Sequence, residues 1–292
     1  MSIEKWRIGR LPDRAYYIPE FITNEEERRL LDKVRLQLLP LTLLIVTQLP
    51  RARGGVAAST PLSVSEEPER TNPVQNSCLT LRIKINSVPL PRWTQLSRRR
   101  LQTWPSALSK TNTLLAAPLP QWLTTPIIPR LEDLTIFSDS PHKMPNHVLI
   151  NEYQPGQGIM PHEDGAAYHP IVATVSLGAP IILDIYGKRS DDDEESGGGT
   201  AVTTQEPRYR VLQESRSLLI TAGSMYTDNL HGIAERARDE NLGSETICNW
   251  DLLADQNSFA AGSYDRETRT SLTYRDVLKV SNLGKSLKFL GK

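Results

Sequence analysis

"IVATVSLG", residues 171–178, decides the fold class of this 292-residue chain. The odd-numbered positions from Ile171 to Leu177 are apolar, and Val, Thr and Ser stand between them, which is the period of a β-strand. The same logic applies to the stretches "NHVLINEY" (146–153), "IILDIYG" (181–187), "YRVLQESRSLLITAG" (209–223) and "TRTSLTYRDV" (268–277). Many short strands with little helix predict a mainly β protein, an antiparallel sandwich or jelly roll with flanking helices.

Outside the strands, the chain divides into segments of different character. Residues 1–34 should contain a helix, because Thr23 and Glu26 have the spacing of a capping box. Residues 35–88 are rich in Pro, Ser, Gly and charge after a Leu-rich run, which predicts a disordered insertion, either lineage-specific or a translated intron. Residues 89–145 should form an irregular covering segment with a short helix over 129–137. The jelly-roll core then spans 146–280, and 281–292 is a basic tail.

The composition limits the function classes. Lys+Arg and Asp+Glu both number 34, so the formal net charge is zero and no strong global field for nucleic acid or membrane is expected. The two cysteines, Cys78 and Cys248, are far apart and lack zinc-site spacing, which indicates a reducing compartment. The apolar run 36–47 contains Pro40 and is too short to span a membrane. We therefore expect a soluble monomer of the cytoplasm or nucleus.

The segment "PHEDG" (161–165) contains a candidate metal site. His162 and Asp164 are two residues apart, so on an extended chain they project to the same face and can bind one ion. An imidazole and a carboxylate suit Fe(II), Mn or Zn. His231, which follows the stretch "LLITAGSMYTDNL", could supply a third ligand at the same end of a jelly roll. The alternative is a solvated polar loop, which is the more common setting of an isolated H-x-D.

The last strand, "RTSLTYR" (269–275), places two arginines on one face. Arg269, Ser271, Thr273 and Arg275 alternate with Thr270, Leu272 and Tyr274. Two guanidinium groups inside a small barrel require an anion, because an unpaired buried charge is costly. A dicarboxylate co-substrate with one end on the metal would meet this need. The alternative is an edge strand whose polar face is solvated.

Taken together, four motifs in order resemble a known family. "NEYQPGQG" (151–158), "HED" (162–164), a distal His231 and "RTSLTYR" resemble the AlkB family of Fe(II)/2-oxoglutarate dioxygenases, whose pattern is N-x-Y-x-x-G, H-x-D, a distal His and R-x-N-x-T-x-R. The phrase "GIMPHEDGAAYHPIVATVSLG" is closest to the eukaryotic homologue-6 branch. The resemblance covers residues 15–34 and 89–280, and it implies a double-stranded β-helix. Ser271 departs from the pattern, since the family usually has Asn there.

The resemblance implies a role for each matching residue. The iron ligands and catalytic residues would be His162, Asp164 and His231. The 2-oxoglutarate site would comprise Asn151 and Tyr153 as hydrogen-bond partners, Arg269 at the distal carboxylate, Arg275 at the metal end near Asp164, and Ser271 with a shorter reach.

The implied activity is a dioxygenase reaction. Fe(II), 2-oxoglutarate and O₂ would be used to oxidise, and thereby demethylate, an alkylated substrate, with nucleic acid as the family expectation. Residues 92–122 would contact it, because Arg98, Arg99 and Arg100 lie near Trp93 and Trp104, a combination that binds phosphates and stacks bases. Two alternatives stay open: a protein hydroxylase or demethylase of the same fold, and a catalytically silent module that binds metal and 2-oxoglutarate.

Overall fold

The computed structural model describes residues 2–36, 93–188 and 206–281 of the chain. Most of the predicted insertion (35–88) and nearly all of the basic tail (281–292) therefore lie outside the described residues, as does the whole of the acidic, Gly-rich stretch 189–199. The proposed division of the chain into five segments stays a prediction. Among the described residues, no helix is long and apolar enough to cross a membrane.

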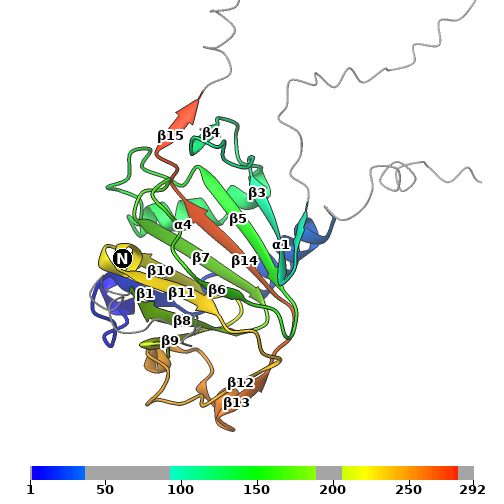
Figure 1. The fold of residues 1–292 in the computed structure, drawn as a ribbon, viewed down its shortest axis with the longest axis vertical. Coiled ribbons are helices and arrows are strands. Elements are labelled where there is room, and N and C mark those ends of the chain that lie inside the picture. Colours follow the sequence, from blue (N-terminus) through cyan, green and yellow to red (C-terminus); the bar gives the residue numbers. More distant parts are fainter. Residues whose placement is uncertain (1, 37–92, 189–205, 282–292) are drawn as a thin grey trace, which may run out of the picture. The chain divides into compact units, whose positions relative to one another are not determined.

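Two antiparallel sheets form the core of the fold (Figure 1). The larger sheet has seven strands in the order β1-β10-β7-β14-β5-β3-β2, and the smaller sheet has four in the order β6-β11-β8-β9. The large-sheet strands are β1 (Ala15–Ile18), β2 (Thr94–Leu96), β3 (Arg99–Trp104), β5 (His147–Tyr153), β7 (Ile171–Gly178), β10 (Leu218–Ala222) and β14 (Arg269–Arg275). The small-sheet strands are β6 (Ile159–His162), β8 (Ile181–Gly187), β9 (Tyr209–Gln213) and β11 (Asn229–Ile233).

The path of the chain between the sheets defines a jelly roll. From β5 to β14 the chain passes repeatedly from one sheet to the other, with β5, β7, β10 and β14 in the large sheet and β6, β8, β9 and β11 in the small one. Eight antiparallel strands in two facing sheets are the jelly-roll arrangement. The fold class predicted from the alternating apolar pattern is confirmed.

Helices cover the outer face of the large sheet. The helices are α1 (Asn24–Leu36), α3 (Gln121–Thr124) and α4 (Ile127–Asp133). Val175 and Leu272 from the strands share a buried cluster with Leu30, Leu123 and Leu131 from the helices. Because strand side chains alternate, the residues between these apolar ones face the opposite side, toward the small sheet. The strand β7 therefore packs against the helices with one face, and its other face, which carries Val172 and Thr174, lines a cavity between the sheets.

The segments that flank the core contribute more regular structure than the sequence indicated. The capping box is confirmed, because the Thr23 amide donates to Glu26 at 2.8 Å and the Glu26 amide donates to the Thr23 hydroxyl at 3.2 Å. However, β1 and the β2–β3 hairpin extend both edges of the large sheet. The helix expected over 129–137 occupies Ile127–Asp133 instead, so the predicted range was wrong at both ends. Strand β1 pairs with β10, and β3 pairs with β5. Both partners are far away in sequence, so a local pattern does not reveal the pairing.

A long excursion between β11 and β14 covers the outer face of the small sheet. It contains the 3-10 helices η3 (Trp250–Leu252) and η4 (Gln256–Phe259) and the paired strands β12 (Arg238–Glu240) and β13 (Ser263–Asp265), joined by turns. Its apolar side chains Leu242, Ile247 and Phe259 pack in a second buried cluster. The sequence does not reveal this cluster, because the apolar residues follow neither the helical nor the strand period.

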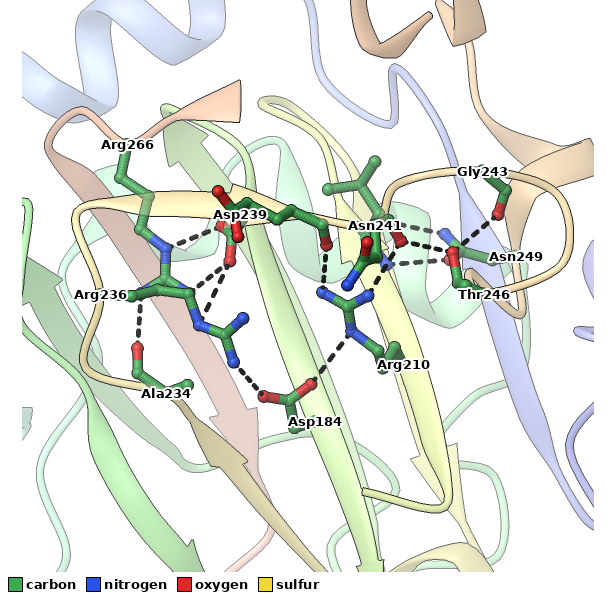
Figure 2. Close-up of polar contacts among 12 residues, drawn as sticks. Asp184, Arg210, Ala234, Arg236, Asp239, Asn241, Gly243, Thr246, Asn249 and Arg266 are labelled. Carbon is green, nitrogen blue, oxygen red and sulfur yellow. Dashed lines mark hydrogen bonds and ion pairs between the residues drawn. The ribbon is translucent and has the colours of Figure 1, made fainter. Parts of the chain in front are cut away.

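Five charged side chains attach this excursion to the small sheet (Figure 2). Asp184 of β8 points away from the cavity-lining Leu183 and Ile185, and lies between Arg210 at 3.6 Å and Arg236 at 3.8 Å. On the excursion itself, Asp239 accepts two hydrogen bonds from Arg266, from Nε and from Nη2, each 2.7 Å long.

The remaining described elements are short. They are η1 (Ile3–Trp6), α5 (Ser224–Thr227), and the parallel pair of β4 (Thr113–Leu115) and β15 (Lys279–Ser281).

Candidate active site

A cavity of about 250 Å³ lies between the two sheets. Its walls come from inward-facing positions of β5, β7, β10 and β14 on one side and β6, β8, β9 and β11 on the other. Every residue predicted for the metal and co-substrate sites lines it: Asn151, Tyr153, His162, Asp164, His231, Arg269, Ser271 and Arg275. Residues spread over more than a hundred positions of the sequence thus meet in one place, although their individual roles stay predictions.

The candidate iron ligands converge at one end of the cavity. His162 on β6 and His231 on β11 face each other across an antiparallel pair, with ring centroids 4.4 Å apart. Asp164 follows β6 directly, and the ligand atoms of the three residues all lie within 4.8 Å of one another. Two imidazoles and one carboxylate that bind one face of a metal ion leave coordination positions open on its other face, which is the arrangement of non-haem Fe(II) oxygenases.

The protonation of the two histidines suits a metal. The Nδ1 atom of His162 lies 2.9 Å from the backbone carbonyl of Met160, which can only accept, so Nδ1 carries the proton and Nε2 is free to ligate. Burial lowers the pKa of His231 to about 4, and His162 and Arg275 nearby act in the same direction, against Asp164. A neutral imidazole is the form that binds a metal.

Arg275 is paired with the carboxylate of the ligand set. Its Nη2 atom donates to Oδ1 of Asp164, and both side chains are buried. Its guanidinium also lies 4.8 Å from the ring centroid of Tyr168. Burial is the largest influence on the pKa of Arg275 and lowers it, but the Asp164 carboxylate and Tyr168 outweigh burial and the pKa stands above its ordinary value. Arg275 therefore lies beside Asp164, at the end of the cavity that carries the candidate iron ligands.

Arg269 lies at the other end of the same strand without a carboxylate partner. Its Nη2 atom donates to the Ser176 hydroxyl at 2.8 Å and to the Gln213 carbonyl oxygen at 3.1 Å, and its Nε atom has no hydrogen-bond partner among the described residues. Burial lowers the pKa of Arg269 to about 10. A buried guanidinium with neutral partners and an unused donor fits the carboxylate of a bound anion.

Three of the predicted co-substrate residues lie between these two ends. Tyr153 is opposite Arg269 across β5 and β14, and Asn151 is opposite Ser271. The Asn151 side-chain oxygen already accepts a 3.2 Å hydrogen bond from Nε of Arg99. Ser271 is buried and lines the cavity, so the shorter side chain expected here leaves more room than an asparagine would.

The β2–β3 hairpin does not present the basic, aromatic surface that the sequence suggested. Arg98 pairs with Glu235 and Arg99 with Asn151, while Arg100 pairs with Glu152 at 2.6 Å and lies 4.4 Å over the Trp93 ring. These arginines are therefore engaged within the chain.

The two tryptophans near these arginines differ in burial. Trp104 is 5% exposed and packs edge-on against Trp122 in the cluster under the helices. Trp93 is partly buried against the same cluster, and neither ring lines the cavity, so a contact of residues 92–122 with nucleic acid stays a prediction. Only Arg99 of the hairpin lines the cavity.

Two polar residues of the cavity escaped the sequence analysis. Gln213 lines its Arg269 end, Ser176 lies behind it in contact with both Arg269 and Gln213, and both side chains are buried. Their signal was weak: each is a single polar residue within an otherwise apolar strand, and their contacts with Arg269 join positions 93 and 56 residues away.

Comparison with known proteins agrees with this geometry. The family model of the 2OG-Fe(II) oxygenase superfamily matches residues 14–275. The chain is 33% identical over its full length to a zebrafish protein (Danio rerio), "Probable RNA/DNA demethylase ALKBH6", and covers 96% of it. The chain therefore belongs to the 2OG-Fe(II) oxygenase superfamily and, within it, to the AlkB family.

Further relatives cover less of the chain. A protein of Macaca fascicularis, "tRNA (carboxymethyluridine(34)-5-O)-methyltransferase ALKBH8", is 34% identical over 47% of this chain, which spans only 18% of that protein. The solved structure of OsALKBH1 aligns with 63% of this chain and 84% of its own, at 15% identity and a TM-score of 0.35.

Membership of the family defines the cofactors. The protein is a dioxygenase that uses Fe(II), 2-oxoglutarate and O₂. The chain's own residues fit this requirement: His162, Asp164 and His231 form a mixed nitrogen and oxygen ligand set. At the far end of the same cavity, Arg269 has no carboxylate partner among the described residues.

Proposed function

We propose that this protein removes alkyl groups from nucleic acid by oxidative demethylation. The observation that carries the proposal is the juxtaposition, in one cavity, of the ligand set His162, Asp164 and His231 with the anion-seeking Arg269. The choice of nucleic acid is supported by the relative from zebrafish, whose full length matches this chain. The alternative of a silent binding module has less support, because the complete set of cavity residues is retained.

The residues of this chain have separable tasks in such a reaction. The three iron ligands would hold the metal, and Arg275 would hold Asp164 in position through its hydrogen bond. Arg269, with Asn151 and Tyr153, would bind and orient 2-oxoglutarate. When bound, the metal, 2-oxoglutarate and O₂ supply the oxidation of a substrate C–H bond, with 2-oxoglutarate converted to succinate and carbon dioxide. A methyl group on nitrogen that is oxidised in this way leaves as formaldehyde.

The proposal also concerns the setting of the enzyme. We propose that it acts in the cytoplasm or nucleus, and the free, buried Cys248 is compatible with a reducing compartment. We propose that it acts as a monomer. The substrate contact would come from the cavity rim, with Arg99 as the hairpin's contribution, since the other two hairpin arginines pair with Glu235 and Glu152.

The deciding experiment uses purified full-length protein. Anaerobic binding of Fe(II) and 2-oxoglutarate is measured first, and succinate and formaldehyde are then quantified in air with methylated RNA, methylated single-stranded DNA and methylated peptides. The wild type should bind both ligands and release formaldehyde from a nucleic acid, whereas Asp164→Ala should release none. Asp265→Ala is the matched control, because Asp265 is exposed and pairs with Arg238 away from the cavity.

Three outcomes would change the proposal. Formaldehyde or a hydroxylated product from the peptides alone would establish the protein-modifying alternative. Tight binding of both ligands without turnover of any substrate would favour the silent module. Equal activity in Asp164→Ala and wild type would show that Asp164 is not needed to hold the iron, which would contradict the proposed iron site.

A further inference from the structure

Three side chains from three strands meet at the end of the cavity that is farthest from the iron ligands. Arg269 of β14 donates to Ser176 of β7 and to Gln213 of β9, at 2.8 and 3.1 Å, and the Ser176 hydroxyl donates to the Gln213 oxygen at 3.3 Å. All three side chains are at most 3% exposed. They form a closed triangle that ties the two sheets together at this end.

The chemistry of the partners fixes the orientation of the Gln213 amide. A guanidinium can only donate hydrogen bonds, so the Gln213 atom that faces Arg269 must be the carbonyl oxygen. That oxygen accepts both hydrogen bonds of the triangle. The amide nitrogen consequently points away from Arg269, and it has no hydrogen-bond partner among the described residues. Because Gln213 lines the cavity, its two N–H donors are available to whatever the cavity binds.

The same end of the cavity lacks a negative charge. The acidic residues among the described lining are Glu163 and Asp164, and these pair with Lys188 and Arg275 instead. Arg269 therefore keeps its full charge among neutral partners, with Nε unused. Arg269 and Gln213 are in contact and both line the cavity, so a ligand at this end would meet a charged side chain and an amide that can both donate hydrogen bonds. A carboxylate, with two oxygens and about four acceptor sites, matches both.

We propose that Gln213 is a specificity-determining residue for 2-oxoglutarate. Its carbonyl oxygen holds the Arg269 guanidinium in position, and its amide donates a hydrogen bond to the distal carboxylate. This proposal rests on the use of 2-oxoglutarate by the protein. It predicts that Gln213 contributes to the binding of 2-oxo acids that carry a distal carboxylate and contributes nothing to those that lack it.

The test compares two ligands on the wild type, Gln213→Leu and Gln213→Glu. Full-length protein with Fe(II) is titrated anaerobically with 2-oxoglutarate and with 2-oxobutanoate, which has the same metal-chelating end but no distal carboxylate. Calorimetry gives the affinity, and the visible absorbance of the Fe(II) chelate gives an independent signal. Leucine keeps most of the side-chain volume and removes the polar groups. Glutamate keeps the shape and gives Arg269 a carboxylate of its own, so this variant should fold even if the leucine variant does not.

The expected results differ between ligands. Gln213→Leu should weaken 2-oxoglutarate binding about 10- to 100-fold, the usual effect of losing a hydrogen bond to a charged group. Gln213→Glu should weaken it further, because the new carboxylate repels the ligand and satisfies Arg269. Both should bind 2-oxobutanoate within about threefold of the wild type, well below the cost of a lost charged hydrogen bond.

Several outcomes would overturn the proposal. Unchanged 2-oxoglutarate affinity in the two variants would show that the amide does not reach the ligand. Equal losses for both ligands would assign Gln213 a purely structural role. Failure of the wild type itself to bind 2-oxoglutarate would instead contradict the co-substrate, which separates that result from the one on Gln213.

Discussion

Arg266 and Arg269 are three residues apart, yet they lie in opposite kinds of environment. Arg266 belongs to the network outside the small sheet (Figure 2), where it donates to both oxygens of Asp239 and to the Ala234 carbonyl, each at 2.7 Å. Arg269 lines the cavity, where a hydroxyl and an amide oxygen are its partners and Nε has no partner in the part of the chain that the structure describes. Both guanidinium groups are almost fully buried.

The difference separates a structural charge from a ligand-binding charge. Burial alone is costly for either arginine, and the folded protein offsets that cost only where a carboxylate and further hydrogen bonds are supplied. At Arg266 the chain supplies them. At Arg269 none of the described residues supplies a carboxylate, and burial lowers its pKa to about 10, which fits a site for a bound anion. The state of pairing, more than burial or sequence position, therefore indicates which of these two arginines is suited to bind an anionic ligand.

The largest expected effect comes from breaking the satisfied pair. Arg266→Met should lower the free energy of unfolding by about 3–5 kcal/mol, because it leaves the buried Asp239 with Arg236 at 4.0 Å as its nearest cation. Urea unfolding followed by circular dichroism measures this. Adding Asp239→Leu to the same chain should recover part of the loss, since both charges are then removed. A loss below about 1 kcal/mol for the single variant would contradict a structural role, since surface substitutions typically cost that little.

A smaller effect should appear when the missing anion is supplied. With Mn(II) present, 2-oxoglutarate at about 100 times its dissociation constant should stabilise the wild type by roughly 2.7 kcal/mol, because it binds only the folded state. Thermal or urea unfolding at rising 2-oxoglutarate concentration measures this. Arg269→Met should show no such stabilisation, while Arg238→Met, a substitution in an exposed pair, should behave as the wild type. Equal stabilisation of Arg269→Met would place the distal carboxylate elsewhere.

The sequence could indicate part of this comparison but not its outcome. Strand alternation in "IVATVSLG" and "RTSLTYR" predicted the sheets and the shared face of Arg269 and Arg275, because period-two patterns are local. The capping box at Thr23 was predictable for the same reason. Whether a given arginine meets a carboxylate was not, because Asp239 and Gln213 come from other strands and loops. The pairing depends on long-range register, and the sequence alone does not contain it explicitly.

The two faces of β3 illustrate the same limit. Trp104 and Arg99 lie five positions apart on one short strand, β3, so their side chains point to opposite faces of the sheet. Arg99 lines the cavity, whereas Trp104 packs under the helices. Proximity in sequence suggested a shared surface for aromatic and basic groups. The pairing of β3 with β5 determines which of them faces the ligand, and that pairing spans about fifty residues.

Removing the unsatisfied charge should cost little. In the absence of metal and 2-oxoglutarate, the free energy of unfolding of Arg269→Met should lie within about 1 kcal/mol of the wild-type value or above it. The reason is that an apolar group replaces a buried charge that has no carboxylate partner among the described residues. The Ser176 hydroxyl can still donate to Gln213, which keeps both polar groups satisfied. Urea unfolding beside Arg266→Met is the measurement. Equal losses in the two variants would eliminate the distinction between the two environments.

The smallest effect concerns a third arginine, which is paired but only partly buried. Arg130 donates to both oxygens of Glu26 at 2.8 and 2.9 Å, and these side chains are 35% and 19% exposed. Burial would raise the pKa of Glu26, but the hydrogen bonds from Arg130 and Thr23 outweigh it, so the pKa lies below its ordinary value. Because the folded pKa is depressed, the contribution to stability is complete above the unfolded pKa and is lost as the pH falls through the folded one.

Glu26→Gln should therefore lower stability by about 1 kcal/mol at pH 7, a value between those of an exposed pair and a buried one. The difference from wild type should persist down to about pH 5 and shrink below that, as the carboxyl group takes up a proton. Glu25→Gln is the matched control, because Glu25 pairs with Arg29 on the same helix with both side chains exposed. Urea unfolding of the three proteins across this pH range measures the effect. A difference that is independent of pH would mean that Glu26 acts through its capping geometry, and that its charge contributes no more than that of Glu25.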